Sequence, residues 1–313
     1  MTAHDAMQDT AAPLVSVLIP AFNHERYVLR CLDSVLEDPY PAKELIIIDD
    51  GSTDRTGARI ADWVATHCMD IPIEYVRREH RGIAATLNEL AARANGEFLR
   101  PGASDDYLLP GGLVAQVDYL LAHPRKVVVI GDSVVVDGDG HKLHDSGMCD
   151  LHGADKSLYH SDDGIRRAVI RQWAIGGPVA LIRKGALDTA DRWSEGLRIE
   201  DWDLFLRLAA RGVLGFIDVH VCAYRLHDAN ASRTRHTGAR IANLAESRHV
   251  AMLRTGLFEE PYRTLLRAQS HYIDAKISFL ERRPWSLLHH LAAYLALAAR
   301  ARLAPAGPHA EGT

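Results

Sequence analysis

Cysteine is scarce in this chain, and basic residues are outnumbered by acidic ones. The 313 residues include four cysteines, and no two of them have the spacing of a CxxC ligand motif, so neither a disulfide framework nor a zinc site is expected. The formal net charge of −5 argues against a nucleic-acid partner, because phosphate binding usually requires a basic face. We expect the cysteines to be reduced core residues: Cys31, Cys68, Cys149 and Cys222.

Long apolar runs and phosphate-binding glycine loops are also missing. No stretch reaches the roughly 20 uninterrupted apolar residues of a membrane-crossing helix. Residues 1–13 are polar and acidic and lack the features of a signal peptide, so we expect a cytoplasmic chain. The turn after the first predicted strand contains no glycine, and no GxxxxGKS/T loop is present. A bound pyrophosphate would therefore need another source of positive charge.

Strand-like and helix-like segments alternate over the first two-thirds of the chain. Val15–Pro20 and Glu44–Asp49 are continuous apolar runs, which is typical of strands buried on both faces of a sheet. This alternation predicts an α/β fold with a mostly parallel sheet flanked by helices. Further strands are expected at 73–77, 97–100, 179–182 and 219–224, with two strands or a hairpin at 127–141. Helices are expected at 25–36, 83–94, 112–121, 161–171 and 201–210.

Strand signals end near Asn230, and the rest of the chain reads as helical. Three helices are expected between 239 and 303, with breaks near Pro261 and Pro284. The last helix is apolar with basic flanks, so it could contact a membrane surface, pack on the rest of the chain or form a homodimer contact. The expected organisation is a disordered N-terminus (1–13), an α/β domain (14–232), a C-terminal helical region (233–303) and a disordered tail (304–313).

Two adjacent carboxylates follow the strand expected at 97–100. Ligands of open parallel sheets bind at the carboxyl ends of the strands, which is where Asp105 and Asp106 should lie. Neighbouring carboxylates repel each other unless they are solvated or bridged by a cation, and their oxygens suit magnesium or manganese. Alternatively, Ser104 and the two aspartates could cap a helix that begins near Pro110.

Five segments, taken in order, resemble the glycosyltransferase family 2 group of nucleotide-sugar transferases, which has the GT-A fold. They are SVLIPAFN, ELIIIDDGSTDRT, HRGIAATLNELAARANGEFLRPGASDD, RIEDWDLFLRLAARG and AYRLHDANAS. The resemblance covers 14–232 and implies a Rossmann-like GT-A sheet with Mn²⁺ or Mg²⁺ as cofactor. It also implies inverting transfer of a sugar from a nucleoside diphosphate sugar of the UDP type to a glycan or lipid-linked hydroxyl in cell-surface polysaccharide synthesis.

The resemblance also assigns donor-binding residues. Pro20, Ala21 and Phe22 would contact the nucleotide through the backbone and the aromatic ring. Asp50 would accept a hydrogen bond from the base, and Arg81 could reach the diphosphate or the base. The residues alone leave other interpretations open, because aspartates in a DDGSTD segment often close a turn and an exposed loop arginine is often only solvated.

The predicted metal site departs from the commoner family form. Many members have an aspartate at the position of Ala103. By the pattern of members that keep only the later pair of acids, Asp106 would bind the metal and Asp105 the ribose. His227, just after a predicted strand, would be a third metal ligand or a diphosphate donor. Leu87 is a second departure, since many members carry arginine there.

The reaction also requires a base, because a sugar hydroxyl is a poor nucleophile until it loses its proton. Helical spacing places Asp201 on an inward stripe with Phe205 and pairs Asp203 with Arg207 as a surface salt bridge. The resemblance assigns Asp201 as the catalytic base. Acids in this turn would also stabilise their own helix dipole.

Two other readings of the sequence remain. A non-catalytic nucleotide-sugar-binding protein, such as a scaffold of a glycan-assembly complex, would need no acid at position 201. A polysaccharide-synthase subunit would need transmembrane helices and a QxxRW motif, and neither is found. The QWAIGGP segment, with Trp173, Gly176 and Gly177, could shape an acceptor pocket, although core packing is the commoner role of tryptophan.

Overall fold

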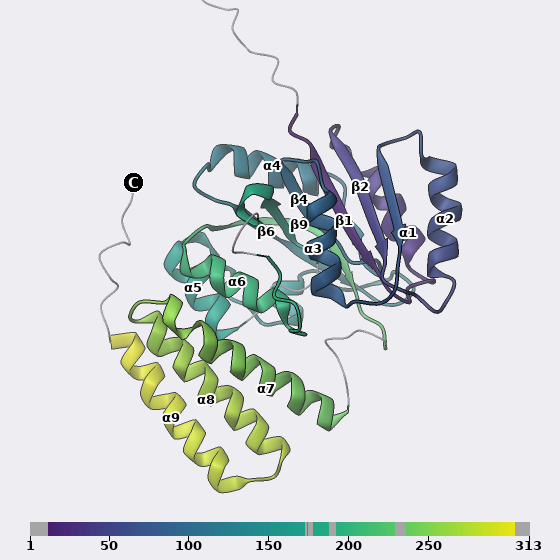
Figure 1. Ribbon diagram of the computed structural model, residues 1–313. Helices are drawn as coiled ribbons and strands as arrows, with labels where there is room; N and C mark the ends of the chain where they lie inside the picture. The colour runs from purple at the N-terminus through teal and green to yellow at the C-terminus, as the bar shows by residue number, and fades with distance from the viewer. Residues whose placement is uncertain (1–11, 173, 175–177, 188–191, 229–235, 304–313) are drawn as a thin grey trace, which may run out of the picture.

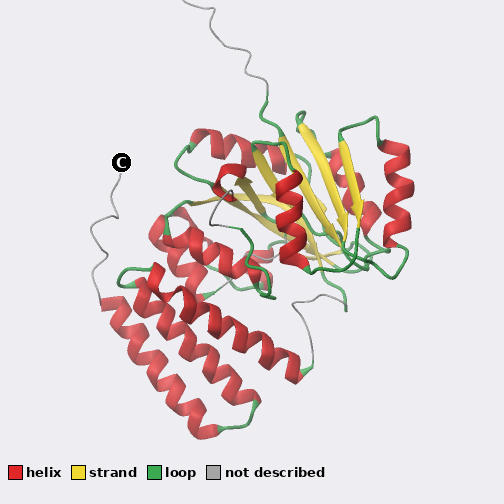
Figure 2. Ribbon diagram, viewed as in Figure 1, coloured by secondary structure: helices red, strands yellow, loops and turns green. Residues whose placement is uncertain are grey.

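The chain forms a twisted sheet with helices on both faces and a layer of three long helices beside it (Figures 1 and 2). The computed structural model describes residues 12–172, 174, 178–187, 192–228 and 236–303. Residues 1–11 and 304–313, from the two segments expected to be disordered, lie outside this range, and so do Trp173, Gly176 and Gly177. The domain boundaries stay predictions.

Within the described residues, nine strands form one sheet in the order β3-β2-β1-β4-β8-β6-β9-β5, with β7 paired to β6. The first four strands of this order are parallel, as the sequence predicts, whereas β8 is antiparallel to both of its neighbours. The strands are β1 (Val15–Ala21), β2 (Lys43–Asp49), β3 (Ile73–Arg77), β4 (Phe98–Pro101), β5 (Tyr107–Leu108), β6 (Val128–Val136), β7 (Lys142–His144), β8 (Ala180–Arg183) and β9 (Leu214–Arg225).

Side-chain alternation along β1 divides the core into two layers. Val17 and Ile19 pack on one side of the sheet, and Leu18 packs on the other. The first side is covered by α1 (Val28–Glu37), α2 (Thr56–His67) and α4 (Gly112–Ala122). The second side is covered by α3 (Ile83–Arg93), α5 (Asp162–Arg171) and α6 (Glu200–Ala210). Burial on both faces explains why the parallel strands are continuous apolar runs.

Several details differ from the sequence prediction for physical reasons. β9 begins at Leu214, five residues earlier than expected, and is exposed in its middle, which breaks the apolar pattern. The sequence pattern did not show α2, since Ile60 and Trp63 are its only large buried side chains. Segment 127–141 is the long strand β6 and the turn of a hairpin with β7. Cys31 and Cys222 are buried as expected, but Cys149 is half-buried and Cys68 is exposed.

The C-terminal region consists of α7 (Thr237–Arg254), α8 (Tyr262–Leu280) and α9 (Pro284–Leu303), with breaks at the predicted prolines. α8 packs against both α7 and α9, and Figure 1 shows α9 as the outermost helix of this layer. Val250 of α7 and Leu266 of α8 join the core beneath α5 and α6. In the part of the chain that the structure describes, no helix has both the length and the apolarity needed to cross a membrane.

Candidate active site

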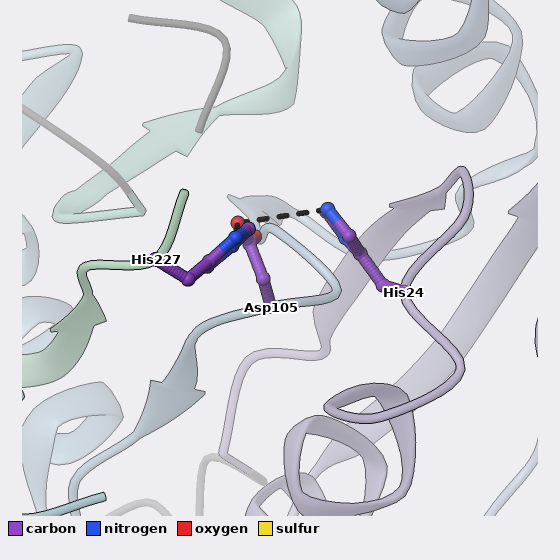
Figure 3. Close-up of side chains that lie close together, drawn as sticks. All are labelled: His24, Asp105 and His227. Atoms are coloured by element: carbon purple, nitrogen blue, oxygen red, sulfur yellow. Dashed lines mark hydrogen bonds and ion pairs between the residues drawn. The ribbon is translucent and has the colours of Figure 1, made fainter. Parts of the chain in front are cut away.

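Two imidazoles and a carboxylate converge at the carboxyl edge of the sheet. Figure 3 shows His24, Asp105 and His227 pointing toward one another from the loops after β1, β4 and β9. Asp105 Oδ2 lies 3.0 Å from His227 Nε2 and 3.7 Å from His24 Nε2. One ligand atom from each of the three residues lies within 4.8 Å of the others. We call this set the ligand cluster; its nitrogen and oxygen donors are of the kind that bind divalent metal ions.

The loop after β1 is held by the loop after β2. Asn23 has a left-handed backbone (φ 54°), and its Oδ1 accepts a hydrogen bond of 2.8 Å from Thr53 N. The backbone N–H of His24 donates to Thr56 Oγ1, also at 2.8 Å. On the imidazole, Nδ1 shares a 2.8 Å hydrogen bond with Ser104 Oγ, which leaves Nε2 facing Asp105.

Asp105 and Asp106 have opposite environments. Burial tends to raise the pKa of Asp105, but the His227 hydrogen bond and the nearby His24 hold it below its usual value. Asp106 is 2% exposed, and its Oδ1 accepts a 2.7 Å hydrogen bond from the backbone of Arg225. Burial, and then the charge of Asp105, raise the pKa of Asp106 well above its usual value. The structure thus brings Asp105, not Asp106, into contact with His227.

Arg225 is the residue that orients this acidic turn. Its Nε donates a 2.8 Å hydrogen bond to the carbonyl of Asp105, and its guanidinium lies 5.0 Å from the ring centre of Tyr27. The Tyr27 ring in turn packs 4.7 Å from that of His227. A cavity of about 490 Å³ lies beside these residues and is lined by His24, Tyr27 and His227 among others. The ligand cluster therefore borders a space large enough for part of a ligand.

Asp50 organises the loop that follows β3. Its carboxylate accepts 2.9 Å hydrogen bonds from the backbone N–H groups of Arg81 and Gly82 and forms an ion pair with Arg78. Asp50 Oδ2 also lies 3.0 Å from His80 Nδ1. Asp49 closes the turn after β2, because its Oδ1 accepts a 2.9 Å hydrogen bond from Ser52 N. This is the turn-closing role that aspartates in a DDGSTD segment often have.

The other predicted donor residues lie around this loop. Phe22 is 40% exposed, and its ring centre is 4.5 Å from that of His80, so the two rings form an open aromatic surface. Pro20 and Ala21 are buried in β1, and the Ala21 carbonyl accepts a 2.8 Å hydrogen bond from Asp50 N. The side chain of Arg81 is exposed, with Nη1 3.5 Å from Glu89. Leu87, at the position where many members have arginine, is buried in the core.

The three acids at the start of α6 have different surroundings. Asp201 is half-buried, and its Oδ1 accepts a 2.7 Å hydrogen bond from Trp202 N. Glu200 is buried, and burial followed by the charge of Asp201 raises its pKa to about 8. Asp203 does pair with Arg207 at 3.2 Å. The prediction of a surface pair is wrong, however, because Asp203 is fully buried.

Asp203 is buried because a second part of the chain covers it. Arg254, in the last turn of α7, reaches Asp203 Oδ1 with its Nε at 2.6 Å, and Ser194 Oγ donates to Oδ2 at 2.7 Å. Helical spacing within α6 does not reveal a partner that lies 51 residues away. Asp203 therefore connects the sheet domain to the C-terminal helices.

Sequence reasoning missed two residues of the site, His24 and Tyr27. This turn follows the first predicted strand, at the edge where ligands of parallel sheets bind, but IPAFNHERY has no pattern that separates a ligand-facing histidine from a solvated one. Two other groups with metal-ligating side chains occur among the described residues, at 137–141 and between α8 and α9. The first is the hairpin turn after β6, which lies beside the ligand cluster: Arg225 Nη1 donates to the carbonyl of Asp137, and Gly138 lines the same cavity. The second lies in the C-terminal helices.

The sequence model described as "Glycosyl transferase family 2" matches residues 16–188. A curated relative, "Putative glycosyltransferase EpsE" of Bacillus subtilis, is 34% identical over 126 residues, which are 40% of this chain and 45% of EpsE. This chain thus spans less than half of that relative.

Two solved structures share the fold. The mannosyltransferase PcManGT from Pyrobaculum calidifontis, in complex with GDP-Man and Mn²⁺, is 21% identical with a TM-score of 0.65, covering 96% of this chain and 78% of PcManGT. S. aureus TarS 1–349 in complex with UDP-GlcNAc is 15% identical with a TM-score of 0.60, covering 92% and 91% of the two chains. Since the family model matches more than half of the sequence, the chain belongs to glycosyl transferase family 2 and is a glycosyltransferase with the GT-A fold.

Proposed function

We propose that this glycosyltransferase moves a sugar, with inversion, from a UDP-sugar to a hydroxyl of a glycan or lipid-linked acceptor in polysaccharide synthesis. The observation that carries the proposal is the ligand cluster at the carboxyl ends of β1, β4 and β9. Because the turn after β1 has no glycine cradle, the donor pyrophosphate requires a cation held at this edge. The two solved structures that share the fold hold UDP-GlcNAc and GDP-Man, so the choice of a UDP-sugar follows from the family resemblance of the sequence.

The residues of the ligand cluster fit a divalent metal ion. Asp105 Oδ2 faces an imidazole nitrogen on either side, at 3.0 and 3.7 Å. Two nitrogens and one oxygen suit Mn²⁺ better than Mg²⁺, which prefers oxygen ligands. When bound, the cation would neutralise the charge that develops on the departing diphosphate. We assign Asp105, His227 and His24 as the ligands.

This assignment replaces Asp106, the ligand that the family resemblance implies, with Asp105. The raised pKa of Asp106 favours its neutral form, and its Oδ1 is engaged by the Arg225 backbone. We assign Asp106 the role of holding the turn against β9 so that Asp105 faces His227. The ribose contact expected of Asp105 is then not part of the proposal.

The nucleotide would lie against the aromatic surface of Phe22 and His80. Asp50 already holds the loop that carries His80 and Arg81, so its first role is to shape this surface. An N–H group of the nucleotide's base would replace one of the two side chains at the Asp50 carboxylate, Arg78 or His80. The replacement is needed because a carboxylate accepts at most about four hydrogen bonds. Arg81 is exposed, and its 3.5 Å ion pair with Glu89 would be exchanged for one with the diphosphate.

Asp201 is our candidate base. Glu200 beside it is buried with a pKa of about 8, so it is mainly protonated at neutral pH, whereas Asp201 is more accessible. Asp201 would accept the proton of the acceptor hydroxyl as that oxygen attacks the anomeric carbon from the face opposite the diphosphate. A single displacement of this kind inverts the anomeric centre.

A donor-hydrolysis screen across UDP- and GDP-sugars with Mn²⁺ tests the proposal. Asp201→Asn should lower turnover by roughly 100-fold or more while leaving donor affinity unchanged. Asp62→Asn, at an exposed position of α2, is the matched control and should turn over normally. Unchanged turnover in Asp201→Asn would remove the base assignment, and turnover with GDP-sugars alone would remove the assignment of a UDP-sugar.

A further inference from the structure

The outward face of α9 is apolar although it is exposed. Trp285 is 83% exposed, Leu288 57%, Leu295 63% and Leu303 86%. The exposed positions between them recur at helical spacing and are three alanines, one histidine and, near the end of the helix, two arginines: Ala292, Ala296, Ala299, His289, Arg300 and Arg302. A helix on the surface of a globular protein usually turns polar side chains to water, so this face requires an explanation.

The opposite face of α9 is already in contact with α8. Tyr294 packs on Tyr272 with ring centres 5.2 Å apart, and Ser286 hydrogen-bonds Ser278 at 2.9 Å. Near the end of the helix, Ala301 is 1% exposed. These contacts fix the rotation of α9 on α8, so the apolar face points outward and does not serve to hold the helix in place.

A groove with apolar side chains and the basic side chains of Arg240 and Lys276 in its lining adjoins this face. A cavity of about 650 Å³ lies between α7, α8 and α9, and Leu291 of α9 and Phe279 of α8 are among its lining residues. Leu291 lies one helical turn from both Leu288 and Leu295, so the groove and the exposed face form one continuous apolar surface. Phe279 itself is 69% exposed.

The formal charge on α9 itself is of one sign. The chain has no acidic residue from Arg282 to Leu303, and arginines stand at both ends of α9. Glu281, just before this stretch, pairs with Arg283 at 3.3 Å. A second copy packed on this face in either direction would bring arginines against arginines, with no acid on the helix to answer them. An anionic surface would pair with both ends at once.

We propose that the outer face of α9, together with the groove beside it, binds the surface of a membrane that contains anionic lipids. The helix lies in the plane of the interface, with Trp285, Leu288 and Leu295 entering the boundary between headgroups and acyl chains. The arginines at its ends pair with lipid phosphates. The helix lies on the membrane rather than crossing it, in keeping with its composition.

This inference goes beyond the proposed function and does not depend on it. Membrane binding would bring the site close to a lipid-linked acceptor, but vesicle binding requires no donor, metal or turnover. Loss of one property can therefore be measured while the other is intact.

The test is flotation of the full chain with phosphatidylcholine vesicles, with and without phosphatidylglycerol. The chain should float with the anionic vesicles and be released by high salt. The double variant Leu288→Glu/Leu295→Glu should stay at the bottom while it keeps its unfolding midpoint and donor hydrolysis. Met69→Glu is the matched control, because Met69 is 91% exposed on the sheet domain, and it should float like the native chain.

A second variant isolates the charge. Arg300→Ala/Arg302→Ala should weaken binding to the anionic vesicles about thirty-fold. Flotation of Leu288→Glu/Leu295→Glu at the native level, or failure of the native chain to float, would overturn the proposal. A native dimer that fails to float and dissociates in the double variant would instead make this face an interface between copies of the chain.

Discussion

The carboxyl edge of the sheet and the outer face of α9 break the usual distribution of side chains in opposite ways. At the sheet edge, the carboxylate of Asp50 is buried and held by hydrogen bonds from the loop after β3. On α9, large apolar groups such as Trp285 are exposed, and the contacts that fix the helix lie on its other face. Buried charge stabilises a defined geometry for chemistry, whereas exposed apolar surface favours association.

The largest effect is expected at Asp203, which joins the sheet domain to the C-terminal helices. Asp203→Ala should lower the free energy of unfolding by about 3–5 kcal/mol, since it leaves Arg254 and Arg207 without their buried partner. Asp218→Ala is the matched control, because that carboxylate is exposed and pairs with Lys156, and it should cost less than about 1 kcal/mol. Urea unfolding measures both. Equal, small losses would show that the joint contributes little to stability.

A direct comparison of Asp105 and Asp106 sharpens the assignment within the sheet edge. Asp105→Asn should reduce Mn²⁺-dependent donor turnover by about a thousand-fold and weaken Mn²⁺ binding, because it removes the charge facing both histidines. Asp106→Asn should stay within about ten-fold of native, since an amide oxygen can still accept from Arg225 N. Turnover and Mn²⁺ titration are the measurements, and the reverse ranking would restore Asp106 as the ligand.

The buried acid beside Asp201 predicts a dependence of stability on pH. The folded state raises the pKa of Glu200 from 4.5 to about 8, so it favours the protonated form. The stability that this contributes is present below about pH 4.5 and is lost as the pH rises toward 8. Glu200→Gln is neutral at every pH. Its free energy of unfolding should therefore fall less over this pH range than that of the native chain, by on the order of 1 kcal/mol or more.

Thermal unfolding across this pH range measures the difference between native chain and Glu200→Gln. Glu79→Gln, at an exposed loop position, should follow the native curve. Parallel curves for the native chain and Glu200→Gln would mean that Glu200 ionises in the folded state as it does in the unfolded one.

The smallest effect distinguishes two exposed aromatic residues, one in each region. Phe22→Ala should raise the donor KM about ten-fold, because it removes one ring of the surface formed with His80. Phe279→Ala, on α8 beside the groove, should leave the donor KM unchanged and weaken vesicle flotation. Donor kinetics and flotation of both variants measure this, and equal effects of the two changes on KM would contradict the separation of the two surfaces.

Local sequence was sufficient for most elements and for the neighbourhood of the site. The apolar runs of β1 and β2 are legible because both faces of these strands are buried, and the prolines before α8 and α9 mark the helix breaks. Ligands of parallel sheets bind at the carboxyl ends of the strands, which led to Asp105, and the family resemblance led to Asp50. Short β5 has too few residues to show any period.

What the sequence by itself determined is the order of the elements, the family and the edge of the sheet where the site lies. Which carboxylate of the Asp105-Asp106 pair faces His227 was decided by Arg225, 119 residues away, and the burial of Asp203 by Arg254. Strand and helix periods depend on near neighbours and can be read locally. The direction and ionisation of a side chain depend on charges and hydrogen bonds that only the folded chain brings within reach.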